Sequence, residues 1–498
     1  MTLNQEPNRE FKQKCSRKLY RQGSRGIKGI TGSLLFVENM TGVGCGELVT
    51  LWGDPVNASS LEEFAKTGQV LQVKDDLCVV QMFDDAPGLE TGRATVWMER
   101  DVAKVGVGEA LRGRILNGRG LPADGRSLYG LEEFLPAKGL PPGLRIPPNG
   151  AIETGISALD LMNTWVRGQR LSLLGGPGLP AGEIAARMAA RALIPGKDGD
   201  FLVIFAAMGV TGREADLFIE TFERDGVTDR SVLVLNKAND PVAERLLAPR
   251  VALTVAEYFA FVKGYDVLVV MADMLHYCDA LREISALRKE IPGRGGYPVA
   301  MYSDLAELYE RSGCIAGCPG SVTQLSVITA PDDDVTHPVA DLSGQLLDGQ
   351  IVLDRELHAK GIFPPFNVQA SLSRSMDRGI GRGKTFDSHR VLADQLRSAY
   401  VKARETRLLR AAVGDAGLSE VGKLYLKFGD AFEKFFVGQK GRERQLERRT
   451  LAQSEAKAWE VLSELPVEEL SCLPQTLLER KIAIGAASPE KSGEPEKK

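Results

Sequence analysis

The sequence predicts three successive parts: a small β-barrel, a parallel α/β domain and a bundle of α-helices. Two observations support this prediction. The chain has 498 residues, and at roughly 150 residues per domain that length suits about three domains. The sequence also changes character twice, from short strand-like runs to alternating strands and helices and then to helical periodicity. The expected boundaries are 1–93, 94–384 and 385–487, followed by a disordered tail at 488–498.

The first part is expected to be all β. Glycine- and aspartate-rich turns separate short apolar or alternating runs, which is typical of a small barrel. The expected strands are Leu34–Val37, Glu47–Trp52, Val70–Val73 and Leu77–Met82.

The second part is expected to be a parallel sheet covered by helices, because strand-like and helix-like segments alternate there. A Pro/Gly-rich connection, 136–150, precedes the first of these segments. The expected strands are Gly168–Leu174, Phe201–Ala206, Val232–Asn236, Val267–Ala272 and Val322–Ala330. The expected helices are Glu183–Leu193, Gly212–Asp225, Pro241–Lys263 and Asp279–Ile291.

The third part, from Ser388 to Arg480, is rich in Leu, Ala, Glu and Arg with helical periodicity, so a helical bundle is expected. The net charge is −4 with both signs interspersed, which argues against a nucleic-acid partner. The longest apolar runs, such as Val267–Met271, are far shorter than the roughly 20 residues of a membrane span. Met1 to Lys18 lacks the apolar core of a signal peptide. We therefore expect a cytoplasmic protein without direct membrane insertion.

No metal site is expected. Seven cysteines in a chain of this length do not form a disulfide scaffold. Cys314 and Cys318 have a three-residue gap, but no second pair completes a four-ligand set. The four histidines are scattered, without ligand spacing, and are expected to be ordinary polar residues: His276, His337, His358 and His389.

The sharpest local pattern is a strand, a glycine-rich loop and a helix in succession. The loop contains Gly175, Gly176 and Gly178. Glycines in this layout let backbone N–H groups turn toward a phosphate, and the helix N-terminus favours an anion. A working loop also needs a Lys for the β- and γ-phosphates and a Ser or Thr for Mg²⁺. Ala181 and Gly182 occupy those places.

Two neighbouring residues weaken the loop further. Pro180 removes a backbone donor, and Glu183 brings negative charge to the place where phosphates would lie. The chain is therefore expected not to hydrolyse ATP on its own. The three glycines remain only a weak candidate contact for ADP or ATP.

Several collinear segments resemble the non-catalytic B subunits of the vacuolar/archaeal-type ATPases. Phe205–Thr211, continued by Phe218–Glu223, and Ser371–Arg374 are the most diagnostic. The resemblance extends from about residue 20 to 440 and includes Tyr20-Arg21, Gly44–Glu47, Arg167–Gln169, Glu183–Ala186, Asn236–Pro249, Arg282–Ser303, Asp333–Pro338, Leu342–Gly349 and Gly361–Arg374.

This resemblance implies a β-barrel, a RecA-like (P-loop NTPase-like) domain and a helical domain. It also implies a non-catalytic subunit that alternates with catalytic A subunits in a hexameric ring, with a central rotor shaft and peripheral stalk subunits as further partners. ATP or ADP with Mg²⁺ would lie at the interface with the catalytic subunit. The complex would couple ATP hydrolysis or synthesis to rotation and to H⁺ or Na⁺ transport, and would hold the chain at the membrane surface.

In the family that these segments resemble, the residue at the position of Arg374 is an arginine that contacts the ATP of the neighbouring subunit. A planar, permanently charged guanidinium meets the charge that spreads over the γ-phosphate oxygens. Arg378, Arg382 and Lys384 are the alternatives if the segment is displaced, and the hydroxyls of Ser371 and Ser373 can orient the loop.

Other positions are expected to be structural. Asp273 follows a strand that resembles a Walker B strand, but the loop lacks the hydroxyl that would share Mg²⁺ with it. A helix cap or a salt bridge is the expected role of Asp273. Glu290 and Arg294 belong either to a collar around the shaft or to a solvated loop.

Two alternatives to an arginine-donating subunit remain. The chain can be a structural or regulatory module that binds ADP or ATP without a role in catalysis. It can also be an autonomous RecA-like motor, although Ala181 and the lack of a basic face argue against this.

Overall fold

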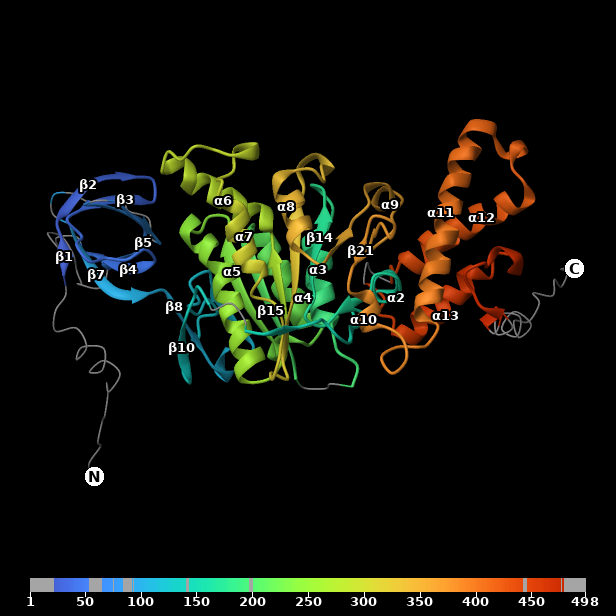
Figure 1. Cartoon of the computed structure of the whole chain (residues 1–498), viewed down its shortest axis with the longest axis horizontal. Coiled ribbons are helices and arrows are strands. Elements are labelled where there is room, and N and C mark those ends of the chain that lie inside the picture. The colour runs from blue at the N-terminus through green and yellow to red at the C-terminus, as the bar shows by residue number, and fades with distance from the viewer. Residues whose placement is uncertain are drawn as a thin grey trace, which may run out of the picture.

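The computed structural model describes residues 22–52, 65–74, 76–83, 92, 94–139, 143–196, 200–441, 446–475 and 477–478. Three parts follow one another along the long axis of the molecule (Figure 1). The expected tail, 488–498, lies outside the described residues.

The N-terminal part is a seven-stranded antiparallel sheet with the order β1-β7-β4-β5-β6-β3-β2. Its strands are β1 (Gly23–Ser24), β2 (Gly26–Thr31), β3 (Leu34–Glu38), β4 (Glu47–Trp52), β5 (Ala65–Lys74), β6 (Leu77–Met82) and β7 (Thr95–Val102). The two edge strands are almost consecutive in sequence, so the sheet nearly closes around buried aliphatic side chains.

The barrel extends further along the chain than the boundary at residue 93 predicted. Strand β7 pairs with both β4 and β1 and therefore belongs to the barrel sheet. The alternation of the sequence changes near Ala94, but this last strand is held by pairing with strands far back in the chain, which local sequence does not reveal.

The central part contains a sheet with the order β21-β20-β14-β19-β17-β15-β16-β9. All of its neighbouring pairs are parallel except β20 with β21. The strands are β9 (Arg114–Asn117), β14 (Arg170–Gly175), β15 (Phe201–Val210), β16 (Ser231–Lys237), β17 (Asp266–Ala272), β19 (Ser321–Thr329), β20 (Gly349–Val352) and β21 (Leu372–Ser373). All five strands expected from the sequence lie in this sheet. Smaller pairings involve β8 (Lys104–Val107), β10 (Glu133–Pro136), β11 (Arg145–Ile146), β12 (Ala151–Ile152), β13 (Trp165–Val166) and β18 (Gly313–Ile315).

Helices cover both faces of this sheet, which explains why its inner strands are almost continuously apolar. One face packs on α3 (Ala181–Arg191) and α4 (Gly212–Arg224). The other packs on α5 (Val242–Glu257, continued as a π-helix by Tyr258–Val262), α6 (Met274–Leu287), α7 (Met301–Tyr309) and α8 (Pro338–Leu346). Short helices α2 (Ser157–Met162), α9 (Arg355–Ala359) and α10 (Met376–Gly379) lie toward the C-terminal part.

The C-terminal part is helical, as predicted. It contains α11 (His389–Val413), α12 (Glu420–Ala431, continued as a π-helix by Phe432–Val437) and α13 (Leu451–Leu462). A side-chain capping box from Thr450 and Gln453 begins α13. Buried aromatic rings of Phe428, Phe432 and Phe436 join this part to the core beneath α3.

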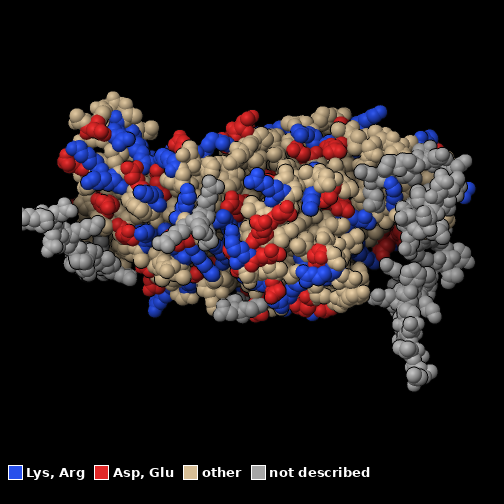
Figure 2. All heavy atoms as spheres, turned by 180° about the vertical axis from the view of Figure 1, so that it is seen from behind, with Lys and Arg blue, Asp and Glu red and all other residues tan. Residues whose placement is uncertain are grey.

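The surface carries mixed charge. On the face that Figure 2 shows, basic and acidic side chains alternate over the described residues without a continuous basic stripe. None of the described helices combines the length and apolar character that crossing a bilayer requires.

Candidate functional site

The glycine-rich loop connects β14 to α3, at the carboxyl end of the sheet where α/β proteins bind ligands. Gly178 has a left-handed backbone (φ 84°) with open space beside it, so a glycine suits that turn. Gly175 ends β14 against Leu353. The layout predicted from the sequence is therefore present.

Side chains that follow the two strands flanking β14 close over this loop. Asp333 follows β19, and Arg355 begins α9 after β20. The guanidinium meets the carboxylate at two points, Nε–Oδ2 at 2.6 Å and Nη2–Oδ1 at 3.0 Å. Arg355 Nη2 also donates to the Pro177 carbonyl at 2.9 Å. A Cβ placed on Gly176 would lie 1.6 Å from Asp333 Oδ1, so the carboxylate rests directly on the loop.

The positions that hold nucleotide in a working loop are used here for packing. Ala181 is buried at the first turn of α3, and a Cβ on Gly182 would lie 3.3 Å from the Phe218 ring of α4. The carboxylate of Glu183 turns along its own helix to Arg187, with Oε1 and Nη2 2.6 Å apart. The expectation that Glu183 points at the phosphate position therefore needs correction.

Asp273 caps α6, as expected. Its carboxylate accepts hydrogen bonds from the backbone N–H of Leu275 at 2.8 Å and of Thr329 at 3.0 Å. Burial raises the pKa of Asp273. Both oxygens are thus committed to holding β17, β19 and α6 together at the end of the strand.

Arg374 follows the edge strand β21, and its side chain is exposed. Its Nη1 donates to the Leu347 carbonyl at 3.0 Å, and its backbone N–H donates to the Asp348 carbonyl at 3.1 Å. Among the described residues no carboxylate forms an ion pair with it. One guanidinium nitrogen is thus bonded to the fold, and the remaining donors of this exposed side chain are available to solvent.

Buried polar side chains fix the strand that carries Arg374. Ser373 Oγ donates to the Thr164 carbonyl at 2.9 Å and lies 3.1 Å from Gln169 Nε2. Ser371 Oγ accepts from the Val352 N–H at 2.9 Å and donates to the Asn367 carbonyl at 2.7 Å. The two serines therefore orient this segment, as the sequence suggested. The anchoring role of Gln169 was not predicted, although it lies in the quoted segment Arg167–Gln169.

Arg374 lies at the opposite end of the sheet from the chain's own glycine loop. Strand β21 runs antiparallel to β20, and Ser373 pairs with Gly349 at the start of β20. The adjacent Asp348 binds Arg170 at the start of β14, whereas the loop begins after Gly175. Five residues of strand at about 3.3 Å each separate the two ends by roughly 16 Å. Arg374 is thus directed away from its own loop.

The alternative cations near Arg374 are also exposed. Arg378 lies in α10, and Arg382 and Lys384 lie in the connection between α10 and α11. Lys384 Nζ donates to the Arg378 carbonyl, which ties this connection to α10. Only Arg374 continues directly from a strand anchored in the sheet.

A cavity of about 780 Å³ separates the helical part from the central domain. Aromatic, basic and amide side chains line it, among them Lys360, Phe363, Phe435, Gln439 and Lys457. The Arg187 guanidinium of α3 lies 5.4 Å from the centre of the Phe363 ring, which places the cavity one helical turn or more beyond the glycine loop.

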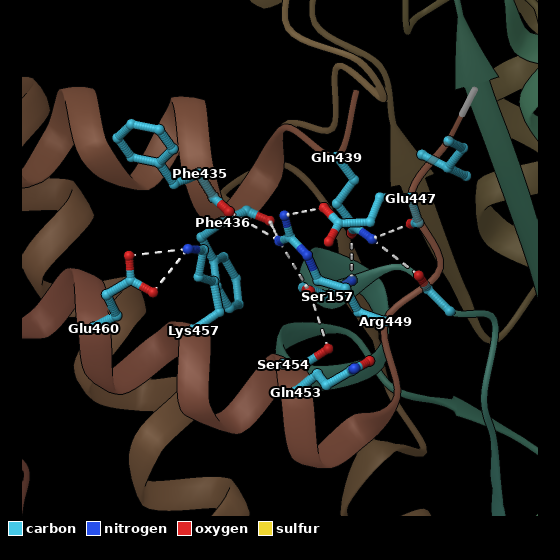
Figure 3. Close-up of polar contacts among 12 residues, drawn as sticks. Ser157, Phe435, Phe436, Gln439, Glu447, Arg449, Gln453, Ser454, Lys457 and Glu460 are labelled. Atoms are coloured by element: carbon cyan, nitrogen blue, oxygen red, sulfur yellow. Dashed lines mark hydrogen bonds and ion pairs between the residues drawn. The ribbon is translucent and has the colours of Figure 1, made fainter. Parts of the chain in front are cut away.

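The wall of this cavity is also the junction between the two domains (Figure 3). Gln439 Oε1 accepts from the Ser157 N–H at 2.7 Å, while Nε2 donates to the carbonyls of Gly155 at 3.0 Å and Glu447 at 2.8 Å. Arg449 Nη1 donates to the Phe435 carbonyl at 2.8 Å. Both polar atoms of the Gln439 side-chain amide are thus used in hydrogen bonds within the protein (Figure 3).

The remaining sequence candidates lie apart from these sites. Arg294 pairs with Asp341 and Glu290 with Arg288, next to the exposed side chains of Ile291 and Val299. His389 is fully buried beside Phe386, and burial lowers its pKa to about 4. Within the described part of the chain, no group of three or more His, Cys, Asp or Glu side chains is arranged to hold a metal ion. Cys314 and Cys318 are free thiols.

Family models match most of the central and helical parts. Residues 155–373 match the nucleotide-binding domain of the ATP synthase alpha/beta family. Residues 378–482 match the C-terminal domain of V and A type ATP synthase. The similarity therefore continues beyond residue 440, where the resemblance seen in the sequence ended.

Two curated relatives are similar over almost their whole length. The V-type ATP synthase beta chain of Thermus thermophilus is 48% identical over 454 residues, covering 89% of this chain and 92% of the relative. An A-type ATP synthase B subunit of Methanospirillum hungatei is 46% identical over 460 residues, covering 92% and 97%. A solved structure, a unique ATP synthase subunit NeqB from Nanoarcheaum equitans, superposes with a TM-score of 0.68 at 35% identity and covers 87% of this chain and 100% of that chain.

Proposed function

This chain belongs to the ATP synthase alpha/beta family, with the B (beta) subunits of V- and A-type ATP synthases, and on that premise we propose that it is the non-catalytic, arginine-donating subunit of a rotary ATPase head. Copies of the chain alternate with catalytic A subunits in a hexameric ring around the rotor shaft, and peripheral stalk subunits hold the ring. ATP or ADP with Mg²⁺ lies between Arg374 and the A subunit. The complex couples hydrolysis or synthesis of ATP to H⁺ or Na⁺ transport and keeps the chain at the membrane surface.

The observation that carries this proposal is the position of Arg374. The guanidinium is exposed at the end of an anchored edge strand and has no carboxylate partner among the described residues. It also lies at the far end of β14 from the chain's own loop. A group placed in this way can complete a site only on a neighbouring molecule.

The chemistry of phosphoryl transfer gives such a group its effect. Negative charge spreads over the γ-phosphate oxygens in the transition state, and a guanidinium can contact two of them at once. An arginine supplied by a neighbour raises turnover by about 10³–10⁵-fold in other nucleotide hydrolases. Loss of the γ-phosphate removes its partner, so the same residue can report the nucleotide state across the interface.

The test is to assemble the wild-type and Arg374→Ala chains with a catalytic A subunit and to measure ATP hydrolysis. The variant complex is expected to lose about 10³-fold or more of its turnover. Arg378→Ala is the matched control and should retain most of it, because Arg378 is exposed on α10, beyond the anchored strand. Near-normal turnover by a fully assembled Arg374→Ala complex removes the proposed role.

A second candidate function, binding of ADP or ATP without catalysis, is favoured by the cavity beside α3. Phe363 and Phe435 line this cavity and can contact a base. Lys360 and Lys457 also line it, each paired with a carboxylate, Glu433 and Glu460. Equilibrium dialysis of the isolated full-length chain with ADP tests this candidate. Micromolar affinity that Phe363→Ala abolishes supports a nucleotide-binding module, whereas no binding by the wild-type chain removes this candidate.

A further inference from the structure

Two charged side chains of this chain, Asp333 and Arg355, lie over the glycine loop. Asp333 and Arg355 extend from the ends of β19 and β20, the two strands that flank β14. Their side chains meet above Gly176 in a two-point ion pair. An acid and a base from separate strands therefore converge at the one place in the central domain where the sequence layout anticipates a phosphate.

The backbone before Asp333 is shaped to deliver this carboxylate. Asp332 and Asp333 both adopt left-handed conformations, with φ of 56° and 57°. Side-chain-bearing residues rarely take this conformation, although aspartate does so more readily than most, and two in succession persist only where the surroundings hold them. The contact of Asp333 with Gly176 and its ion pair with Arg355 stabilise this backbone conformation.

The glycine itself is part of the arrangement. Only the absence of a Cβ on Gly176 allows Asp333 Oδ1 to approach the loop, because any side chain there would collide with the carboxylate and with Arg355 Nη2. The arginine then joins the carboxylate to the loop through the Pro177 carbonyl. Loop, carboxylate and guanidinium form one connected unit.

We propose that the Asp333 carboxylate is an internal anion that closes the degenerate loop to phosphate. It places negative charge against Gly176 and occupies the guanidinium of Arg355, a cation that lies directly against the loop and that the phosphates of a ligand would use. The loop is therefore blocked by its own chain in addition to lacking a lysine. This inference does not depend on Arg374, and its test uses the isolated full-length chain rather than the assembled complex.

The test measures the binding of inorganic tripolyphosphate to the chain by titration calorimetry, at low salt and without Mg²⁺. Asp333→Ala removes the negative charge and frees Arg355, so this variant is expected to bind tripolyphosphate at least tenfold more tightly than the wild-type chain. Asp333→Ala combined with Arg355→Ala is expected to lose that gain. Asp334→Ala is the matched control, because the Asp334 carboxylate accepts from Thr336 instead of resting on the loop, and it should bind as the wild type does.

Two results overturn the proposal. One is wild-type binding as tight as that of Asp333→Ala. The other is an Asp333→Ala chain that has the wild-type circular dichroism spectrum but gains no affinity. If Asp333→Ala does not fold, Asp333→Asn carries the same test, since it removes the charge and keeps the size. Turnover of the assembled Arg374→Ala complex is unaffected by either result, so failure of this inference is distinguishable from failure of the proposed function.

Discussion

Two regions of the molecule use arginine in opposite ways. At the junction of the central and helical domains, the Arg449 side chain is buried and donates to the carbonyls of Phe435 and Phe436 and to the Glu447 carboxylate. At the edge strand β21, Arg374 is exposed and its side chain donates to one carbonyl. The same guanidinium chemistry is thus satisfied within the fold in one region and left open to solvent in the other.

Under the proposed function, this difference separates side chains that stabilise the fold from a side chain that acts on a neighbouring subunit. A buried polar group must keep its partners, because losing one leaves the other unsatisfied in a site without water. An exposed charge contributes little to stability and remains available to a neighbouring molecule. Substitutions at the junction should therefore lower the unfolding free energy of the isolated chain. Substitutions at Arg374 should instead lower the turnover of the assembled complex.

The largest effect on folding is expected for Gln439→Ala. The change deletes three hydrogen bonds. Two of them are buried and join the two domains, and their loss leaves the Ser157 N–H without this acceptor. The expected loss is about 3–4 kcal/mol of unfolding free energy. Urea titration of the isolated chain, followed by circular dichroism, measures it.

Gln453→Ala is the control for that experiment. Gln453 is exposed and accepts only from the Thr450 N–H at the start of α13, so its loss should cost about 1 kcal/mol or less. Equal losses for the two glutamines would show that the junction bonds are not what stabilises the domain contact.

The pH dependence of stability comes next. His389 is buried where α11 packs on α2, and burial lowers its pKa to about 4 from 6.5. Between these values the unfolded chain binds more protons than the folded one. The stability that His389 contributes is therefore complete above pH 6.5 and is lost as the pH falls toward 4, by at most about 3 kcal/mol.

His389→Gln tests this, because the variant lacks the titrating imidazole and should lose less unfolding free energy as the pH falls. Urea midpoints at pH 7.5 and pH 5.0 should differ less for His389→Gln than for the wild-type chain. His358→Gln, a substitution on the exposed surface of α9, should keep the wild-type difference. A wild-type pH dependence in His389→Gln would mean that other groups cause the acid destabilisation.

Arg374→Lys sharpens the contrast at the edge strand. Lysine keeps the positive charge but loses the planar pair of donors. A lost charge-assisted hydrogen bond of about 1.5–3 kcal/mol corresponds to a fall of about tenfold to hundredfold in the turnover of the assembled complex. Full activity with lysine would show that a point charge suffices.

The smallest expected effect is that of Arg374→Ala on the chain alone. Because the side chain is exposed and forms a single hydrogen bond to Leu347, its removal should change the unfolding free energy by less than about 0.5 kcal/mol. Thermal and urea unfolding measure this. A loss of several kcal/mol would place Arg374 with Arg449, among the residues that hold the fold together.

Much of the fold was predictable, because the hydrophobic periodicity and the turn residues of short segments indicate their secondary structure. The five apolar strands of the central sheet, the glycine loop and the helical character after Ser388 follow from periodicity and turn residues. The short elements β20, β21, α2 and α9 were not identified individually, because runs of two to six residues carry too little periodicity. The closing barrel strand β7 was assigned to the wrong side of a boundary for a related reason: its partners are distant in sequence.

Residue identity and spacing were sufficient to identify the family, the missing lysine at Ala181 and the candidate Arg374, since both are properties of the chain. Which charges are paired, and where they lie, depends on how the chain folds. Asp333 and Arg355 are separated by a helix and a strand in the chain, yet they meet over Gly176. Gln439 reaches Ser157 across most of the molecule's sequence. Such contacts depend on how parallel strands and packed helices bring distant segments together, which no local pattern encodes.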